Sequence, residues 1–444
     1  NTRGRGFHPL NRMPSHLKPS NPVVRFPMAL FVVAALPVFG NAGPIRPPSI
    51  GGTDVAITGF GAVADGTAPV TSAIQLAINQ AAASGGGRVV IPKGVFVSGP
   101  IVLTSRIDLH LADGAVLRMS DDRSLYPVTK NNRAAFISAN KASDIRLSGN
   151  GIIDGQGESW WKTYIEEKAA GSKDAPRRPQ LIAFKDCQRV EVEGVTTLNP
   201  PNTHYSFKQC EDLAIRNVKA TAPDDSPNTD ALNLSNVKNV LITGSSISTG
   251  DDNIALLCGA AKTGGVPEVE NVVIRDCVMG FGHGISIGSY TSGGVRNVTV
   301  EKVTFDGTTS GIRMKSDRSR GGVVEGIRYR GITMKNVRYP VFITSYYPKP
   351  PETPAADRPF KGKPLLPVWR DIVIENVAVT DSKNSIVFWG LPEQAIENIT
   401  LKNVKISASA GAMVFHARNI RFSNVEIVPG AGLPLRIHNA EVHG

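Results

Sequence analysis

A short hydrophobic pattern recurs along most of this 444-residue chain. It reads polar, aliphatic, any residue, aliphatic, as in Asn239-Val240-Leu241-Ile242. Alternation of this kind places both aliphatic side chains on one face of a β-strand. The ten copies begin at residues 144, 189, 212, 239, 271, 297, 326, 371, 398 and 419.

The copies follow one another at intervals of 45, 23, 27, 32, 26, 29, 45, 27 and 21 residues. Periods of about 20–30 residues built from short strands are typical of a β-solenoid, because coils stacked about 4.8 Å apart bury a face that one coil cannot bury alone. Each 45-residue interval holds either one coil with a long excursion or two coils with one unrecognised copy. The expected excursions cover residues 155–180 and 346–369. The fold class is all-β.

A helix is predicted over residues 72–84, where Ile74, Ala77, Ile78 and Ala81 have helical spacing. Thr71 or Ser72 is the expected N-cap, and the glycines at 85–87 end the helix. It would cover the first coil, as the end of a solenoid requires. We therefore expect an N-terminal cap at about 51–100 within one catalytic domain over residues 43–444.

Residues 1–42 read as a leader. An apolar run from Phe26 to Phe39 follows Arg25 and ends at Ala42. It is shorter than the roughly 20 apolar residues that span a bilayer, so a secretory signal cleaved after Ala42 is predicted rather than a membrane anchor. The mature protein would be secreted, extracellular or periplasmic, with no stable membrane insertion.

Charge and cysteine content restrict the partners. The formal net charge is +11, and residues 1–42 carry five basic residues and no acidic one, so the remainder is moderately basic. Such a body suits a polyanionic ligand. Four cysteines are too few and too scattered for a disulfide scaffold or a zinc site. Two of them precede adjacent copies of the pattern and are expected to form a buried pair rather than a bridge: Cys187 and Cys210.

Charged side chains recur at a similar depth, 12 to 18 positions into four successive copies. Equal depth in successive coils predicts that they stack on the same strand position along one outer face. The face would extend roughly 15 Å, because each coil adds about 5 Å. The residues are Asp230, Asp251, Asp252, His283, Arg313 and Lys315.

Each group alone also has a structural interpretation. Residues 250–253 form a good turn, residues 282–284 suit a tight corner, and Arg313 with Lys315 suits a solvated strand face. Their coincidence on four consecutive coils favours a functional site. Neighbouring Asp251 and Asp252 would both reach it only if the strand bulges at Gly250.

Glycoside hydrolysis is catalysed by a protonated carboxylic acid that acts together with one or more ionised carboxylates. Like charges raise the pKa of one member, so such a cluster titrates as a unit. An activated serine or cysteine nucleophile and metal-ligand spacing are both missing from the sequence, which predicts neither metal nor cofactor. Arg313 and Lys315 are two residues apart and would bind the carboxylate of an acidic sugar.

From about residue 55 to 425 the chain resembles the polygalacturonases, family 28 of the glycoside hydrolases. The motifs that carry the resemblance are Asn-Thr-Asp at 228–230, Gly-Asp-Asp at 250–252, Gly-His-Gly at 282–284 and Arg-x-Lys at 313–315. The resemblance implies a single-stranded right-handed parallel β-helix that cleaves α-1,4-galacturonosyl bonds of pectin with inversion. It further implies a monomer that binds an acidic plant cell-wall polysaccharide and no nucleic acid.

The same resemblance implies a role for each site residue. Asp251 looks like the general acid, Asp230 and Asp252 would activate water, and His283 would support the protonation of the acid. Arg313 and Lys315 would hold the uronate. The other implied substrate-binding residues are Asn228, His204 and Tyr346.

This chain departs from the family pattern at Ala231, Leu257 and Thr203, and Leu257 stands where many members carry a lysine. Carboxylates stacked about 5 Å apart would by themselves suggest retention, but we follow the resemblance and expect inversion.

Three alternatives stay open: a hydrolase of decorated pectin (xylogalacturonan or rhamnogalacturonan), a polysaccharide lyase, and a non-catalytic β-helical glycan-binding protein or adhesin. Endo or exo action depends on whether the two excursions close one end of the groove.

Overall fold

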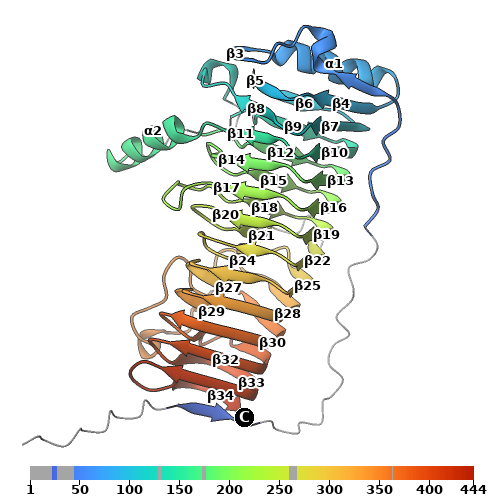
Figure 1. Cartoon of the computed structure of the whole chain (residues 1–444). Helices are drawn as coiled ribbons and strands as arrows, with labels where there is room; N and C mark the ends of the chain where they lie inside the picture. The colour runs from blue at the N-terminus through green and yellow to red at the C-terminus, as the bar shows by residue number, and fades with distance from the viewer. Residues whose placement is uncertain (1–22, 28–44, 129–132, 173–176, 260–267, 363) are drawn as a thin grey trace, which may run out of the picture.

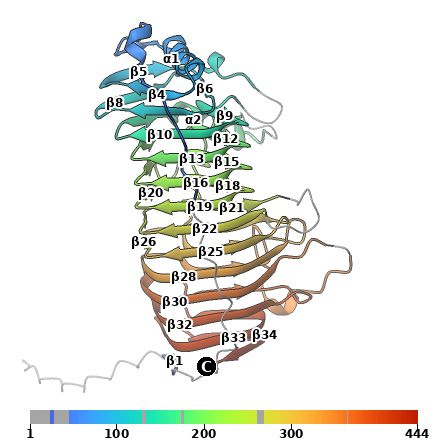
Figure 2. The same ribbon diagram turned by 90° about the vertical axis from the view of Figure 1, so that its right-hand side faces the viewer.

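The structure is a computed structural model that describes residues 23–27, 45–128, 133–172, 177–259, 268–362 and 364–444. Its described residues form one elongated solenoid in which each coil lies on the next (Figures 1 and 2). A typical coil contributes one strand to each of three stacks, numbered here 1 to 3 in chain order, and neighbouring strands within every stack run parallel. The predicted parallel β-helix is confirmed.

Stack 1 begins at the N-terminal end of the molecule and contains the strands that carry the recurring pattern. Its members are β2 (Asp54–Ala56), β4 (Gly87–Ile91), β7 (Ile107–Leu111), β10 (Ser143–Gly149), β13 (Gln188–Glu193), β16 (Glu211–Arg216), β19 (Lys238–Thr243), β22 (Val269–Arg275), β25 (Val295–Glu301), the first parts of β28 (Val323–Lys335), β30 (Val368–Ser382) and β32 (Ile396–Ala408), and the middle part of β33 (Ala412–Pro429).

Stack 2 follows in each coil and merges with stack 1 where the later strands lengthen. Its separate members are β3 (Asp65–Pro69), β5 (Gly94–Ser98), β8 (Ala115–Met119), β11 (Ile152–Asp154), β14 (Thr196–Leu198), β17 (Lys219–Thr221), β20 (Ser246–Ser248), β23 (Val278–Met279) and β26 (Thr304–Asp306).

Stack 3 closes each coil and is the stack beside which the predicted site residues fall. Its members are β6 (Ile101–Leu103), β9 (Ile137–Asn140), β12 (Ile182–Lys185), β15 (Tyr205–Lys208), β18 (Leu232–Ser235), β21 (Ile254–Cys258), β24 (Ile285–Thr291), β27 (Ser310–Lys315), β29 (Tyr339–Thr344), β31 (Ile386–Trp389) and the first parts of β33 (Ala412–Pro429) and β34 (Leu435–His443).

The polar residue that opens each copy of the pattern has a structural reason. All ten have φ between +52° and +67°, the left-handed region that Asn, Asp and Gly tolerate best. Their side chains also pair between coils: Nδ2 of Asn271 donates to Oδ1 of Asn239 at 3.1 Å, and Nδ2 of Asn297 donates to Oδ1 of Asn271 at 3.2 Å. This ladder and the left-handed corner keep successive coils in register.

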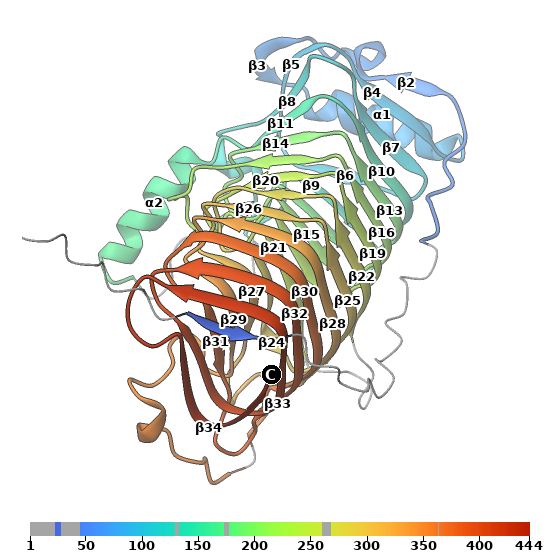
Figure 3. The ribbon, with the colours of Figure 1, turned by 60° about the horizontal axis from the view of Figure 1, so that its bottom comes forward.

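Both 45-residue intervals are one coil with a long excursion, because β10 pairs directly with β13 and β28 pairs directly with β30. The first excursion lies between stacks 2 and 3 and contains helix α2 (Glu158–Ala169), which projects from the solenoid in Figures 1 and 3. The second leaves stack 3 after β29 and contains the 3₁₀ helix η3 (Pro354–Ala356). The other 3₁₀ helices are η1 (Ile57–Phe60) and η2 (Arg123–Leu125).

Helix α1 (Thr71–Ala83) covers the N-terminal coil as predicted, burying Ile74, Ala77 and Ile78. The predicted cap is wrong. The N-cap is Val70, without a side-chain hydrogen bond, because Oγ1 of Thr71 instead accepts from the backbone N–H of Gly99 at 2.7 Å.

Most of the predicted leader lies outside the described residues. Its strand β1 (Val24–Phe26) pairs antiparallel with β33 at the C-terminal end of the solenoid, where Phe26 packs edge-on against Phe422 with ring centroids 4.9 Å apart. Cleavage after Ala42, which stays a prediction, would remove this strand. None of the helices among the described residues is long and apolar enough to cross a bilayer.

The cysteines are free and buried, as expected. Burial raises the pKa of Cys258 to about 12 and that of Cys277 to about 11, so both stay thiols at neutral pH. Cys187 and Cys210 precede strands β13 and β16, which pair with each other, so they lie on neighbouring coils.

Candidate active site

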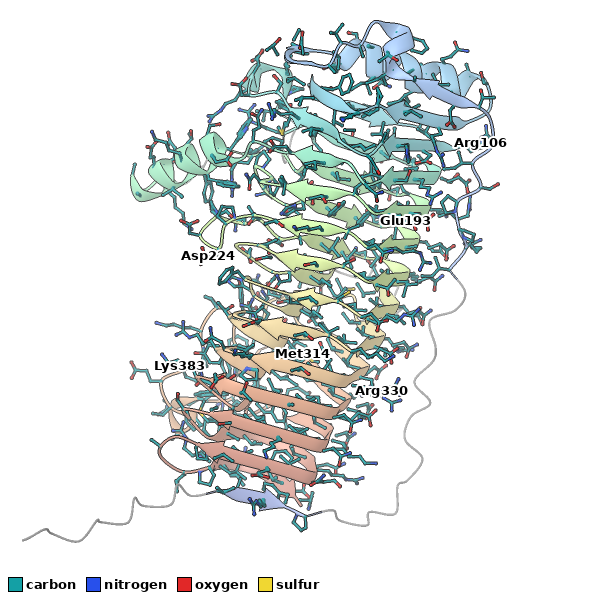
Figure 4. The ribbon with its side chains drawn as sticks, in the orientation of Figure 1. Arg106, Glu193, Asp224, Met314, Arg330 and Lys383 are labelled. Atoms are coloured by element: carbon teal, nitrogen blue, oxygen red, sulfur yellow. The ribbon has the colours of Figure 1, made fainter. Side chains whose placement is uncertain are left out.

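The turns that lead into stack 3 carry the acidic residues and the histidine. Asp230 lies two residues before β18, Asp251 and Asp252 precede β21, and His283 precedes β24. Only Arg313 and Lys315 lie within a strand, β27, with Met314 between them pointing into the core and fully buried (Figure 4). The predicted common side is confirmed, but the acids occupy turns rather than the strand.

Glycines make room for these turns. A Cβ at Gly250 would collide with the backbone carbonyl oxygen of Ser226 in the preceding coil, so Gly250 permits a close approach of the two turns. Gly282 and Gly284 have φ of +128° and +75°, which place the intervening His283 beside Asp251. The two turns therefore meet where the carboxylates lie.

Asp252 is the centre of the charged network. Its Oδ1 accepts from Oγ of Ser286 at 2.7 Å and from Nη1 of Arg313 at 2.8 Å, while its Oδ2 accepts from Nζ of Lys315 at 2.9 Å. Lys315 and Asp252 are each only 5% exposed. Both cations therefore converge on one carboxylate from two coils further along the solenoid.

Asp251 is held from two sides. Its Oδ1 lies 2.9 Å from Nδ1 of His283 and accepts from the backbone N–H of Asp252 at 2.8 Å. Its Oδ2 accepts from Nδ2 of Asn228 at 3.3 Å. Burial raises the pKa of Asp251, but the hydrogen bond and charge of His283, with Lys315, outweigh burial and lower it overall.

Asp230 has the opposite shift. Burial raises its pKa well above the ordinary value, and the nearby charges of Asp251 and Asp252 raise it further, against a smaller lowering by Lys315. The three carboxyl groups are therefore a coupled set in which a proton is held most readily at Asp230.

These directions bear on the role expected for His283. A hydrogen-bond donor or positive ring favours the ionised carboxylate, so its contact lowers the pKa of Asp251. In this arrangement the contact with His283 favours the ionised form of Asp251, and the expected role of His283 in supporting the acid stays a prediction.

Replacing Asp230 with Asn should stabilise the protein at neutral pH. The folded-state pKa of Asp230 is raised, so the native state binds more protons than the unfolded state, and this group destabilises the fold as pH rises above its ordinary pKa near 3.8. We expect the melting temperature of Asp230→Asn to exceed that of the wild type at pH 7 and to converge with it below pH 3.8. Equal melting temperatures at both pH values would contradict the raised pKa.

His204, one of the predicted substrate-binding residues, does not reach the surface of the site. His204 is fully buried, its Nδ1 lies 2.9 Å from Oγ1 of Thr197, and burial lowers its pKa to about 3. It is a neutral core residue, because its side chain points from the turn before β15 into the interior. Direct contact with a substrate is ruled out in this conformation.

Tyr346 is turned away from Lys315. Its ring packs edge-on against Trp389, with centroids 6.2 Å apart, and lies under the guanidinium of Arg318. The neighbouring Tyr347 lies next to Lys315 instead, with Nζ of Lys315 5.4 Å from the centroid of its ring. Both tyrosines line a cavity of about 370 Å³ together with Lys349. Because Tyr346 also lines this cavity, its role in substrate binding stays a prediction.

Asn228 lies in the site as predicted and contacts Asp251. Ser286 was not predicted as a site residue, and it lies in β24 in register with Arg313 in β27. A signal for Ser286 existed in principle, since residues aligned across neighbouring strands share a face.

Asp251, Asp252 and His283 offer ligand atoms within 4.8 Å of one another, a grouping that could hold a cation. Arg313 and Lys315 already place two positive charges on Asp252, which disfavours a further cation there. The absence of a metal in the working protein stays a prediction.

Asp230 and Asp251, whose pKa values are shifted in opposite directions, lie with a third carboxyl group beside an imidazole and two cations, an arrangement typical of a glycosidase. Residues 83–431 match the family described as glycosyl hydrolases family 28, and the chain belongs to that family.

Relatives agree with this assignment. The chain is 33% identical over 361 residues to an endo-polygalacturonase of Pectobacterium parmentieri, covering 77% of this chain and 85% of that protein. Among solved structures it is similar to a polygalacturonase of Erwinia carotovora ssp. carotovora (28% identity, TM-score 0.71, 86% of this chain and 100% of that one). It is also similar to a hyperthermoactive exopolygalacturonase of Thermotoga maritima (26% identity, TM-score 0.75, 88% and 95%).

Proposed function

We propose that this protein hydrolyses the α-1,4-galacturonosyl bonds of pectin, with inversion, by general acid and base catalysis. The observation that carries the proposal is the convergence of Asp230, Asp251 and Asp252 with Arg313 and Lys315, since it joins bond-cleaving carboxyl groups to cations that suit a uronate. The family assignment and the polygalacturonase relatives support the same substrate class.

In this mechanism Asp251 protonates the departing glycosidic oxygen, while Asp230 and Asp252 activate the water. The pKa of Asp251 is lowered in the free protein, so its protonation has to accompany substrate binding. A bound galacturonate chain would exclude water and bring negative charge beside the cluster, and both effects raise the pKa of a carboxyl group. The proton that is held at Asp230 is one source within the same charged cluster.

Cations near the site support a polyanionic substrate. Arg313 and Lys315 face Asp252, and a uronate carboxylate would compete with Asp252 for them. Beyond Lys315, the cavity next to Tyr347 adds Lys349 to the positively charged surface. Charge of one sign along a binding surface attracts a polymer of the opposite sign.

The test is incubation with polygalacturonate and analysis of products over time. New reducing ends, released first as the β anomer and seen by NMR before mutarotation, are the expected result of inversion. Products that absorb in the ultraviolet would identify a lyase, and unchanged polymer would indicate a non-catalytic glycan-binding protein; either result contradicts the proposal. Xylogalacturonan and rhamnogalacturonan are the comparison substrates, on which slower cleavage is expected.

We further propose that the protein is secreted, because its polymeric substrate lies outside the cell and residues 1–42 have the pattern of a signal peptide. N-terminal sequencing of protein recovered from the culture medium or periplasm should begin at Gly43. A mature chain that retains residues 24–26 would contradict cleavage at Ala42.

A further inference from the structure

Arg178 is a buried cation that the mechanism above does not use. It lies near the end of the excursion that contains α2, just before β12, and is only 4% exposed. Its Nη1 donates to the backbone carbonyl oxygens of Pro201 at 2.9 Å and Pro227 at 2.6 Å. Its Nη2 donates to Oδ1 of Asn228 at 2.8 Å. Burial lowers the pKa of Arg178, which shows that the charge is held there at a cost.

Helix α2 contributes to holding this guanidinium. Cζ of Arg178 lies 3.9 Å from the centroid of the Tyr164 ring, a distance at which a cation is attracted to the aromatic face. A planar guanidinium that stacks on a ring and donates to three oxygens is fixed in one orientation. The excursion therefore supports a rigid donor beside the site.

The orientation of the Asn228 amide follows from this donor. An asparagine side chain has one acceptor oxygen and one donor nitrogen, and arginine can only donate. With Oδ1 facing Arg178, Nδ2 has to face the opposite side, where it donates to Oδ2 of Asp251 at 3.3 Å. The backbone of Asn228 is left-handed, with φ of +56°, so the side chain leaves the turn in a direction that reaches both partners.

We propose that Arg178 is a positioning residue for the reaction: through the fixed amide of Asn228 it sets the orientation and proton affinity of Asp251. The inference rests on the proposed function, in which Asp251 is the general acid. An amide N–H that donates to a carboxylate favours its ionised form. Loss of this donor should therefore raise the pKa of Asp251 and extend activity to higher pH while lowering its maximum.

The test compares Arg178→Gln, Arg178→Lys and Asn228→Leu with the wild type on polygalacturonate. We expect Arg178→Gln to lower kcat at least 10-fold with KM changed less than 3-fold, and to move the alkaline limb of the pH–rate profile to higher pH. Arg178→Lys keeps the charge but lacks the planar fork, so its kcat should lie between those of the wild type and Arg178→Gln. The double variant Arg178→Gln/Asn228→Leu should be no slower than Asn228→Leu alone, because both changes break the same chain of contacts.

Lys162→Gln is the matched control, since it removes an exposed positive charge from the same excursion. It should leave kcat and the pH profile unchanged. If Arg178→Gln lowers only the melting temperature, or if the two single losses multiply in the double variant, Arg178 is merely structural and the inference is overturned.

A wild type without activity on polygalacturonate would overturn the proposed function instead. In that case NMR titration of His283, whose Nδ1 lies 2.9 Å from Oδ1 of Asp251, still reports the inference. A His283 titration that is identical in the wild type and Arg178→Gln would contradict the coupling to Asp251.

Discussion

Asp251→Asn should lower kcat on polygalacturonate about 10²–10⁴-fold, the usual contribution of a general acid. The amide has nearly the shape of the carboxyl group but cannot deliver a proton to the glycosidic oxygen. Asparagine keeps one acceptor oxygen for the backbone N–H of Asp252 and loses only the acceptor that faces Asn228, so KM should change little. Steady-state rates of reducing-end formation measure the effect.

An aryl α-galacturonide separates the acid from the base. Its leaving group departs without protonation, so Asp251→Asn should recover most of its activity on this substrate, whereas Asp252→Asn should not. Asp224→Asn is the control, because Asp224 is an exposed acid at the edge of the molecule in the same turn region (Figure 4). Near-normal turnover of polygalacturonate by Asp251→Asn would end the assignment of Asp251 as the acid.

Lys315→Met should raise KM for polygalacturonate roughly 10- to 100-fold, since a charge-assisted hydrogen bond contributes about 1.5–3 kcal/mol. Methionine preserves the length of the buried side chain, and Asp252 keeps Ser286 and Arg313 as donors. The fold should therefore survive. Isothermal titration with a galacturonate oligomer, using the Asp251→Asn background to prevent cleavage, measures the loss directly.

A methyl-esterified oligomer tests whether the lost contact is to a carboxylate. It should bind the wild type and Lys315→Met with similar affinity, because its carboxyl groups carry no charge. Lys383→Met, which changes an exposed lysine in a later coil before β31 (Figure 4), should bind both ligands as the wild type does. Equal weakening for both oligomers would mean that Lys315 serves only to hold Asp252.

Much of the fold could be predicted from the sequence because a solenoid repeats one local rule. The recurring aliphatic pairs marked ten strands of stack 1, and each copy begins at a left-handed residue that Asn or Asp tolerates. Counting from those starts placed Asp230, Asp251 and His283 on one side, because coils of similar length turn at similar depth. The N-cap of α1 escaped prediction because the hydroxyl of Thr71 serves a contact 28 residues away.

Site details that depend on side-chain direction could not be predicted. Spacing did not distinguish Tyr346 from Tyr347, since adjacent residues point to opposite sides and only the path of the second excursion decides which one meets Lys315. His204 has the same limitation, because its motif gives no sign that the ring points into the core. Arg178 contacts Asn228, which lies 50 residues later in the sequence, and a local sequence pattern cannot predict such a contact.

In this solenoid the spacing of the acids and the access of a polymer to the site are set by different parts of the backbone. The spacing of the acids along the solenoid is set by backbone hydrogen bonds between coils, whereas the excursions leave the coils between stacks 2 and 3 and between stack 3 and stack 1 of the next coil. Lengthening or exchanging the second excursion would therefore alter access to the site and leave the spacing of the acids in place, whereas the first excursion also carries Arg178, which fixes the amide of Asn228.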